Sequence, residues 1–334
     1  PGDEVSASVP LLFSPQSPAQ GPNRLMAALW LMDKNNPLTP RVTANRVWAQ
    51  LFGKGIVETE EDFGSQGALP SHPELLDSLA VQFRDEYRWS LKKLIRAIVL
   101  SNTYQQSFVF DEARRERDPQ NRWLSRSSRF RLSAEAVRDQ TLAAAGLLSS
   151  KQGGPPVMPP QPEGLWRSTY SGARWITSPG EDRYRRGIYT FWKRTTPYPS
   201  METFDATTRE VCQIRRIPTN TPLQALVTLN DPVYVEASLA MAQRWYQLAS
   251  SDAERIERGF QIAMIRPIAE SERLRLQDLL ARSRQHFANR DGEARRLLEQ
   301  AAFSLDPSIP PNEIAAWSVL TSTVINLDEF LMRP

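Results

Sequence analysis

The sequence predicts a mainly α-helical, bundle-like fold with a small β-hairpin and a long loop rich in proline and glycine. Apolar residues recur at positions i, i+3 and i+4 through most of the chain, which is the spacing of an amphipathic helix. Residues that favour strands gather in two short stretches, LWRSTY (165–170) and RRGIYTFWKRT (185–195), and these predict the hairpin. The segment SSKQGGPPVMPPQPEG (149–164) cannot hold regular structure and predicts the loop.

Composition places the chain among globular proteins. Of its 334 residues, 40% are hydrophobic and 24% are charged, which allows a substantial core. No apolar run approaches the roughly 20 residues that cross a bilayer. A net charge of +3 is too small for the dominant basic field that nucleic-acid binding requires, so that class of function is excluded.

The elements are expected in the following order. Residues 1–21 lack the basic start and apolar core of a signal peptide, and they predict an extended linker that continues a longer precursor. A helical half over 22–149 comes next, followed by the loop and β insertion over 150–216. A second helical half covers 217–332, where apolar stripes recur up to the C-terminus.

Prolines and glycines mark the ends of these helices. Pro40, Pro73, Pro222 and Pro232 stand directly before apolar-periodic runs, and the first turn of a helix accepts proline because the N–H there has no partner. Gly53, after the stripe that ends at Phe52, predicts a left-handed residue that ends a helix. Within that helix, Asn45 and Arg46 interrupt the apolar pattern and predict a buried hydrogen-bonding group with a structural role.

The segment Gly53-Lys54-Gly55 does not read as a phosphate loop. A Walker loop needs Ser or Thr directly after the lysine, and here a glycine and an isoleucine follow. The acids after it are expected to be solvated or to cap helices. Asp62 is kept as a weak catalytic candidate, because it precedes Phe63-Gly64 and is positioned to anchor a turn.

Metal and cofactor chemistry finds little support in this chain. A single cysteine, Cys212, excludes an intrachain disulfide, a cysteine zinc site and a c-type haem attachment motif. Two histidines, His72 and His286, fall short of the three protein ligands of an ordinary catalytic zinc site. We therefore predict no metal site and no cofactor in this chain.

The strongest candidate binding segment interleaves cations with aromatic residues between 183 and 198. Such a mixture stacks sugars or bases and grips acidic groups. The alternative is a core strand whose arginines pair with neighbouring acids, and the residues alone favour that alternative. The candidate binding residues are Arg185, Arg186, Tyr189, Trp192, Lys193, Arg194 and Tyr198, with Trp166 and Trp175 nearby in sequence.

Catalytic candidates are weak. Glu202 and Asp205 follow the aromatic segment and, with Asp62, supply carboxylates for proton transfer. His72 between Ser71 and Pro73 could act as a base, but helix entry is the favoured role. The Gly-x-Ser-x-Gly motif of serine hydrolases does not occur.

Four long segments resemble the planctomycete-type family of unknown function numbered fifteen fifty-three. They are NPLTPRVTANRVWAQLFGKGIVETEEDFGSQGALPSHPELLDSLA, RRGIYTFWKRTTPYPSMETFDAT, RRIPTNTPLQALVTLNDP and INLDEFLMRP, in the order of the chain. Because they run across both helical halves, we expect one interwoven domain over 22–332. The resemblance implies an exported protein, periplasmic or at the cell surface. It also implies another uncharacterised domain upstream, often with a cytochrome-c-like haem module, and it carries no known activity.

Two functions are therefore compared. The first is a non-catalytic interaction module that docks the upstream domain, a redox partner or an extracellular polymer. The second is an enzyme or binding protein for acidic or sulfated glycans, which would use the Arg–aromatic segment and nearby carboxylates. An enzyme should show a pocket with convergent acids and arginines, whereas a docking module should show a broad apolar surface.

Overall fold

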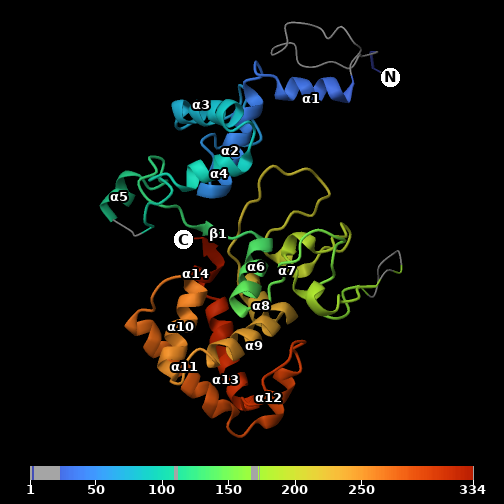
Figure 1. Ribbon diagram of the computed structural model, residues 1–334, viewed down its shortest axis with the longest axis vertical. Helices are drawn as coiled ribbons and strands as arrows, with labels where there is room; N and C mark the ends of the chain where they lie inside the picture. Colours follow the sequence, from blue (N-terminus) through green and yellow to red (C-terminus); the bar gives the residue numbers. More distant parts are fainter. Residues whose placement is uncertain (1, 4–22, 109–111, 167–171, 173, 334) are drawn as a thin grey trace. The chain divides into compact units, whose positions relative to one another are not determined.

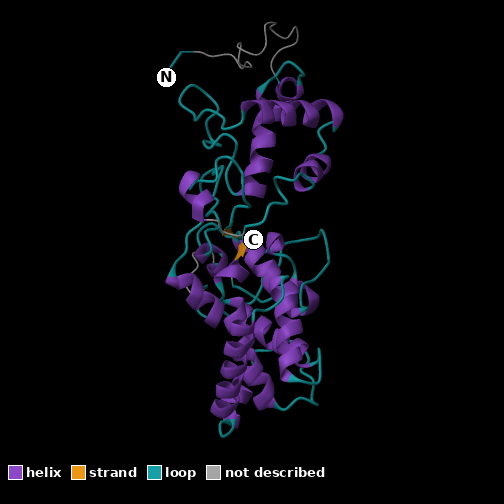
Figure 2. Cartoon of the chain, turned by 90° about the vertical axis from the view of Figure 1, so that its left-hand side faces the viewer, coloured by secondary structure: helices purple, strands orange, loops and turns teal. Residues whose placement is uncertain are grey.

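The computed structural model describes residues 2–3, 23–108, 112–166, 172 and 174–333. Helices make up most of the described chain, and a single two-stranded antiparallel sheet is found there (Figures 1 and 2). The mainly α fold with a small β element is confirmed. The expected linker over 1–21 lies almost entirely outside the described residues.

Contacts divide the chain into two units at Arg129–Phe130. We call the part up to Arg129 the N-unit and Phe130–Arg333 the C-unit. The boundary precedes the loop rich in proline and glycine, which belongs wholly to the C-unit. One interwoven domain over 22–332 stays a prediction.

The N-unit is built around the longest of its helices, α2. Trp48 and Phe52 of α2 stack at 4.1 Å between ring centroids and pack with Leu94 and Ile98 of α4 in one buried cluster. The elements are α1 (Arg24–Met32), α2 (Leu38–Phe52), α3 (Pro73–Val81), the π-helical turn Gln82–Glu86, α4 (Leu91–Val99) and α5 (Glu112–Arg117).

The segment after α2 is structural, as predicted. Gly53 is left-handed at φ 79°, and its N–H donates to the Ala49 carbonyl at 2.8 Å to end the helix. Asn45 is fully buried and forms two hydrogen bonds with the backbone of Val57, at 2.8 and 2.9 Å. The expectation that Arg46 joins this buried group is wrong, because Arg46 is exposed to solvent.

The C-unit is built around α9 and α13, which pack against each other with buried side chains (Figure 1). Trp245 of α9 and Trp317 of α13 are completely shielded from solvent. The helices are α6 (Ala134–Ala145), α7 (Pro199–Thr203), α8 (Pro222–Asn230), α9 (Pro232–Tyr246), α10 (Asp252–Met264), α11 (Glu270–Phe287), α12 (Asp291–Leu298), α13 (Pro311–Ile325) and α14 (Asp328–Leu331).

The predicted proline positions hold. Pro73, Pro222 and Pro232 are the first residues of α3, α8 and α9, and Pro40 lies in the first turn of α2. Asp231 before Pro232 caps α9 by accepting a hydrogen bond from the Val233 amide at 3.0 Å.

The β structure of the described residues lies elsewhere than expected, and residues 167–170 of the first expected strand lie outside those residues. Strand β1 (Phe130–Arg131) pairs with β2 (Met332–Arg333), whereas 185–195 contains 3-10 turns and a single bridge between Val157 and Thr190. The partner segment explains this difference. Val157 and Met158 are flanked by Pro155, Pro156, Pro159 and Pro160, which have no N–H to donate, so the ladder cannot continue beyond one bridge.

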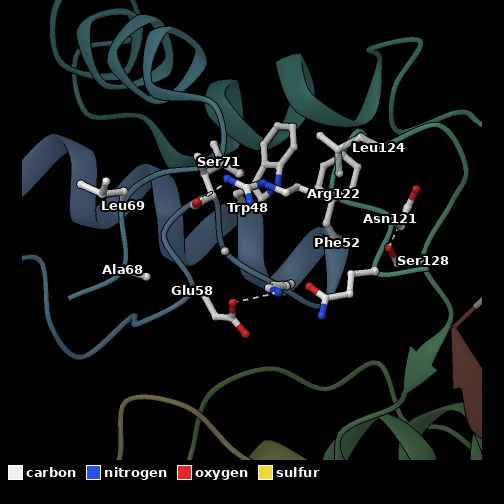
Figure 3. A pocket seen from close by; sticks show the side chains of 14 residues that line it. Trp48, Phe52, Glu58, Ala68, Leu69, Ser71, Asn121, Arg122, Leu124 and Ser128 are labelled. Atoms are coloured by element: carbon white, nitrogen blue, oxygen red, sulfur yellow. Dashed lines mark hydrogen bonds and ion pairs between the residues drawn. The ribbon is translucent and has the colours of Figure 1, made fainter. Parts of the chain in front are cut away.

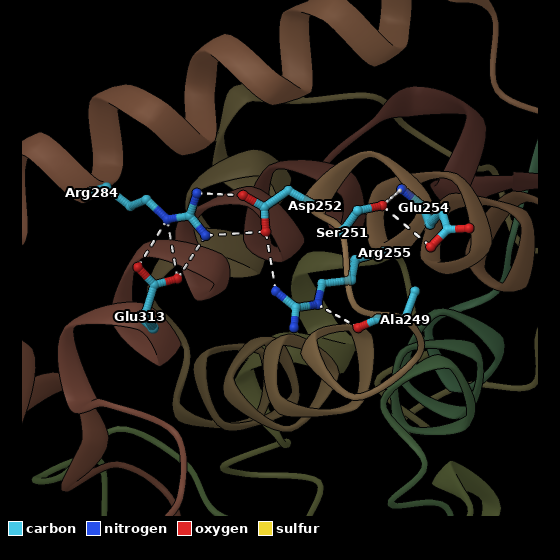
Figure 4. A network of polar contacts seen from close by, with 7 residues as sticks. All are labelled: Ala249, Ser251, Asp252, Glu254, Arg255, Arg284 and Glu313. Atoms are coloured by element: carbon cyan, nitrogen blue, oxygen red, sulfur yellow. Dashed lines mark hydrogen bonds and ion pairs between the residues drawn. The ribbon is translucent and has the colours of Figure 1, made fainter.

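A polar network ties three helices of the C-unit together (Figure 4). Arg284 of α11 donates to Glu313 of α13 at 2.8 and 2.9 Å and to Asp252 of α10 at 2.5 Å. Asp252 also accepts from Arg255 at 3.1 Å. These hydrogen bonds hold the pKa of the Asp252 carboxyl below its usual range.

Arg284→Gln is expected to lower the free energy of unfolding by roughly 1 kcal/mol at neutral pH, since the side chains are about one-third exposed and solvent weakens the pairs. A carboxyl with a lowered pKa stabilises the fold above its unfolded pKa of about 3.9, and that contribution is lost as pH falls through the folded value. The gap between variant and wild type should therefore shrink below about pH 4. Urea unfolding of the variant and the wild type, at neutral pH and below about pH 4, measures this difference in the free energy of unfolding.

Arg282→Gln is the matched control on the same helix. Arg282 pairs with Asp278 in an ion pair whose side chains are 75% and 58% exposed, so its loss should leave stability unchanged. Equal effects of the two substitutions would contradict the structural role of the Arg284 network.

Candidate functional site

The structure gathers several of the predicted binding residues into one aromatic cluster in the C-unit. Trp166 and Trp175 meet edge to face at 5.3 Å, and Trp175 stacks on Tyr198 at 5.7 Å. Phe191 closes the cluster at 6.3 Å from Trp166. Lys193 places its ammonium 4.8 Å from the Trp166 ring, which is within cation–π range.

A pocket of about 910 Å³ opens beside this cluster, and we call it the Trp pocket. Two hydrogen-bonding atoms in its lining are buried without a partner in the described chain, namely Trp166 Nε1 and Gln161 Oε1. Buried polar atoms normally have a hydrogen-bond partner. A donor and an acceptor without one in the same lining therefore suit a polar ligand or water. The lining includes Gln161, Glu163, Leu165, Trp166, Arg174 and Trp175.

Other members of the predicted set have structural roles. Arg185 is buried, donates to the carbonyls of Gly153 and Pro155, and lies 3.7 Å over the ring of Tyr189. The Tyr189 hydroxyl in turn accepts from the Gly153 amide at 2.8 Å. Together they fix the loop rich in proline and glycine against the 3-10 turn Gly187–Tyr189.

The remaining predicted binders are divided between the core and the surface. Arg186 pairs with Asp139 at 3.0 Å and Trp192 donates to the Thr208 carbonyl at 3.1 Å. Tyr198 is buried and donates to the Pro160 carbonyl at 2.5 Å, and burial raises its pKa. Arg194 is exposed to solvent.

The carboxylates Glu202 and Asp205 do not converge on the Trp pocket. Asp205 has a left-handed backbone at φ 61° and accepts hydrogen bonds from the Thr219 amide and hydroxyl at 2.7 and 2.9 Å. These hydrogen bonds fix the position of Thr219, shortly before α8 begins at Pro222. Glu202 is exposed on the short helix α7.

The two remaining catalytic candidates lie in the N-unit and serve the backbone. Asp62 Oδ1 accepts from the Gly64 amide at 2.7 Å, which makes the turn that was expected. His72 precedes α3, and its Nδ1 is 3.0 Å from the Ser71 hydroxyl. This is the helix-entry position favoured by the sequence.

A second pocket of about 360 Å³ lies within the N-unit, and we call it the Asn121 pocket (Figure 3). Asn121 is 8% exposed with φ 51°, and its Nδ2 donates to the Arg126 carbonyl at 2.8 Å, while its Oδ1 has no partner in the described ranges. No feature of the sequence indicated this site. Its walls come from three stretches, 48–58, 68–71 and 120–128, that only folding brings together.

The most solvent-exposed apolar segment of the C-unit is also absent from the predicted site residues. Six large apolar side chains between 211 and 229 are at least 42% exposed, and we call them the 211–229 surface. They are Val211 (66%), Ile214 (44%), Ile217 (76%), Leu223 (57%), Leu226 (55%) and Leu229 (42%). The spacing of the three leucines by three residues is the sequence signal that could have indicated this helix face.

One buried acid has an unusual titration. Desolvation raises the pKa of Asp231 to about 6, against the opposing effects of its bond from Val233 and of the nearby Arg138. Arg138 is itself 2% exposed, and its Nε and Nη1 have no partner among the residues that the structure describes. Neither pocket described above includes these two residues, which are both buried.

Within the described ranges, no three His, Cys, Asp or Glu side chains are grouped so that they could hold a metal ion. None of the helices in the described ranges is long and apolar enough to cross a membrane.

Comparison with known proteins identifies the family. The family model PSD1, described as a protein of unknown function (DUF1553), matches residues 23–280, which span both units. Searches of curated proteins and of solved structures gave no match. Because the match covers well over half of the sequence, the chain belongs to the PSD1 (DUF1553) family.

Proposed function

We propose that the chain is a non-catalytic docking module, and the 211–229 surface is the observation that carries this proposal. Gln224 and Thr228 form the buried side of α8, so Leu223 and Leu226 are left to face solvent. Exposed apolar patches of this kind mark interaction surfaces, since burying one such side chain is worth about 1.5–3 kcal/mol.

The occupant of this surface is the upstream domain of the same exported precursor. Family membership supports this choice, because the resemblance implies an uncharacterised domain before this one. Arg209, Glu210 and Arg215 are exposed on the same segment, so the matching face should be apolar with a charged rim. Any c-type haem of the assembly would belong to that upstream part, at the periplasm or cell surface.

Site-specific photo-crosslinking in the producing cell tests this proposal. A benzophenone amino acid in place of Leu226 should crosslink to the upstream domain, and the same probe at Leu274 should not. Leu274 is a matched control, since it is 54% exposed on α11 of the same unit. Equal crosslinking at both positions, or none at Leu226, would refute the proposal.

A second candidate function is binding of acidic or sulfated glycans at the Trp pocket. The specific observation is a pocket lined by two indole rings and by Arg174, whose lining also holds Trp166 Nε1 and Gln161 Oε1 without a partner among the described residues. Such a surface offers stacking, hydrogen bonds and positive charge to a sugar chain. Glu163 is the acid that lines it, so we propose binding without hydrolysis.

Arg174→Gln should weaken binding of a sulfated polysaccharide about fivefold to tenfold, because Arg174 lines the pocket and one charge-assisted contact is lost. Affinity electrophoresis in gels with carrageenan, and with dextran as the uncharged comparison, measures the change. Arg194→Gln is the control, because Arg194 is also exposed but does not line the pocket. Equal retardation by carrageenan and dextran would contradict a site for acidic glycans.

A further inference from the structure

One side of α4 in the N-unit forms a further interaction surface: we infer that it adsorbs to an anionic phospholipid surface. This side of the helix combines cations with aliphatic side chains. It shares no residue with the 211–229 surface or the Trp pocket, so the inference is independent of both proposed functions. We call its exposed residues the α4 face, and they are Leu91, Lys92, Lys93, Ile95, Arg96 and Leu100.

The α4 face is open because the core uses only one side of this helix. Leu94 and Ile98, four residues apart, are buried and belong to the same cluster as the apolar residues of α2. Lys92, Ile95 and Arg96 follow the i, i+3, i+4 spacing of another side, and all three are exposed. The three aliphatic members of the face are between 40% and 58% exposed. Apolar area therefore remains in contact with water beside three cations.

The positive charge of this segment has few acids to balance it. Residues 87–110 contain four cations and no aspartate or glutamate. The cations are Arg88, Lys92, Lys93 and Arg96. All four are exposed, and none forms an ion pair with a residue that the structure describes. Of the two acids directly before this stretch, Asp85 already binds Arg84 at 2.7 Å. Even if the other, Glu86, balanced one cation, most of the charge would remain for an anionic partner.

These cations do not stabilise the fold of the N-unit. Lys92 and Lys93 lie in the first turn of α4, where a cation opposes the positive end of the helix dipole, and that turn contains no acid. Arg88, just before the helix, has a left-handed backbone at φ 49°, which is unfavourable for a residue other than glycine. The cations thus gather where they weaken the helix, and an anionic surface would offset that cost.

An anionic lipid surface fits the α4 face better than an acidic sugar chain does. Anionic headgroups attract lysine and arginine, and the acyl region beneath them accepts aliphatic side chains. Sugars stack on aromatic rings, which line the Trp pocket but are absent from the α4 face. One face of a nine-residue helix is small, so the adsorption should be reversible and should weaken as salt screens the charges.

Sedimentation of the whole chain with sucrose-loaded vesicles tests the inference. Vesicles that contain phosphatidylglycerol should bind the chain, and vesicles of phosphatidylcholine alone should bind it at least about tenfold more weakly. The triple variant Lys92→Gln, Lys93→Gln, Arg96→Gln should lower the affinity about a hundredfold, because each cation near an anionic surface contributes about fivefold. Equal binding to the two kinds of vesicle, or binding to neither, would overturn the inference.

A second triple variant with the same change in net charge is the matched control. Arg275→Gln, Arg295→Gln and Arg296→Gln together remove three exposed arginines of α11 and α12, and vesicle binding should stay nearly unchanged. Equal losses in the two triple variants would show that net charge drives binding, and would refute a role of the α4 face. Lys92→Gln alone should weaken binding about fivefold, which keeps the test valid if the triple variant fails to fold.

Ile95→Ser separates a lipid surface from an acidic protein. Ile95 is 40% exposed, and loss of its aliphatic side chain should weaken vesicle binding about threefold. Leu274→Ser, at a position 54% exposed on α11, is the control and should have no effect. Vesicle binding that is the same for Ile95→Ser and the wild type would contradict contact with the acyl region. Retention of the wild type on immobilised polyglutamate, without binding to vesicles, would assign the face to an acidic protein and refute the lipid surface.

Discussion

Gly259→Ala should lower the free energy of unfolding by about 3 kcal/mol, the upper part of the range for overpacked cores. A β-carbon at Gly259 of α10 would lie 2.1 Å from Cδ2 and 2.4 Å from Cε2 of Trp245. Trp245 is completely buried in α9, and its indole cannot move aside without displacing the rest of the core. The substitution therefore forces α10 and α9 apart.

Urea unfolding followed by tryptophan fluorescence measures this loss. Gly292→Ala is the matched control, since Gly292 lies in the first turn of α12 with open space around its α-carbon. That variant should be unchanged or more stable by up to about 1 kcal/mol, the difference between alanine and glycine in a helix. If both alanines have the same effect, the close approach to Trp245 does not limit stability.

A double variant separates the contact from any general effect of the site. Trp245→Ala removes the ring atoms Cδ2 and Cε2 that the new methyl group would meet, at the cost of a cavity. Gly259→Ala should then cost less in the Trp245→Ala background than in the wild type. A coupling free energy of at least about 1 kcal/mol is expected for residues in direct contact. Additive effects would contradict the proposed clash.

Much of the fold could be predicted because helix boundaries are set by local chemistry. The positions of Pro73, Pro222 and Gly53 follow from the missing N–H of proline and the conformational freedom of glycine, which need no knowledge of distant residues. Apolar stripes gave the buried faces for the same reason, and Trp48 and Phe52 are examples.

Strand pairing could not be predicted in the same way. Phe130 and Arg333, which pair with each other, stand at the two ends of the C-unit in sequence. The residues around one strand carry no information about which distant segment will pair with it. The β-forming residues at 185–195 misled the prediction, because the segment beside them has too few N–H donors for a ladder. Propensity was outweighed by the chemistry of the partner segment.

The candidate sites show the same limit. The sequence identified Trp166, Trp175 and Tyr198 as aromatic residues worth attention, and the structure places them in one cluster. It could not distinguish Arg185, which is buried as a support for the loop, from Lys193, which lies over Trp166. Burial of a charged side chain depends on tertiary contacts, and adjacent residues in a mixed segment give no sign of it.

Asn45→Ala should lower the free energy of unfolding of the N-unit by roughly 3 kcal/mol. The Asn45 amide accepts a hydrogen bond from the Val57 N–H at 2.8 Å and donates one to the Val57 carbonyl at 2.9 Å. Both residues are buried. Alanine leaves two buried backbone groups without partners, at about 1–3 kcal/mol each. Hydrogen exchange of the 53–60 peptide, with urea unfolding, measures the loss. Arg46→Ala, an exposed neighbour on α2, is the control and should have little effect.

Asn45→Asp adds a pH signature that a simple packing defect would lack. The carboxylate still accepts from the Val57 amide, but it faces the Val57 carbonyl without a hydrogen to donate, whereas the protonated acid can donate. Burial and this bond should raise the folded pKa of the new group above the unfolded value of about 3.9. The difference in the free energy of unfolding between Asn45→Asp and the wild type should then be largest above the folded pKa. It should shrink as pH falls toward about 4. A stability gap that stays constant over this range would show that the Val57 carbonyl does not depend on residue 45.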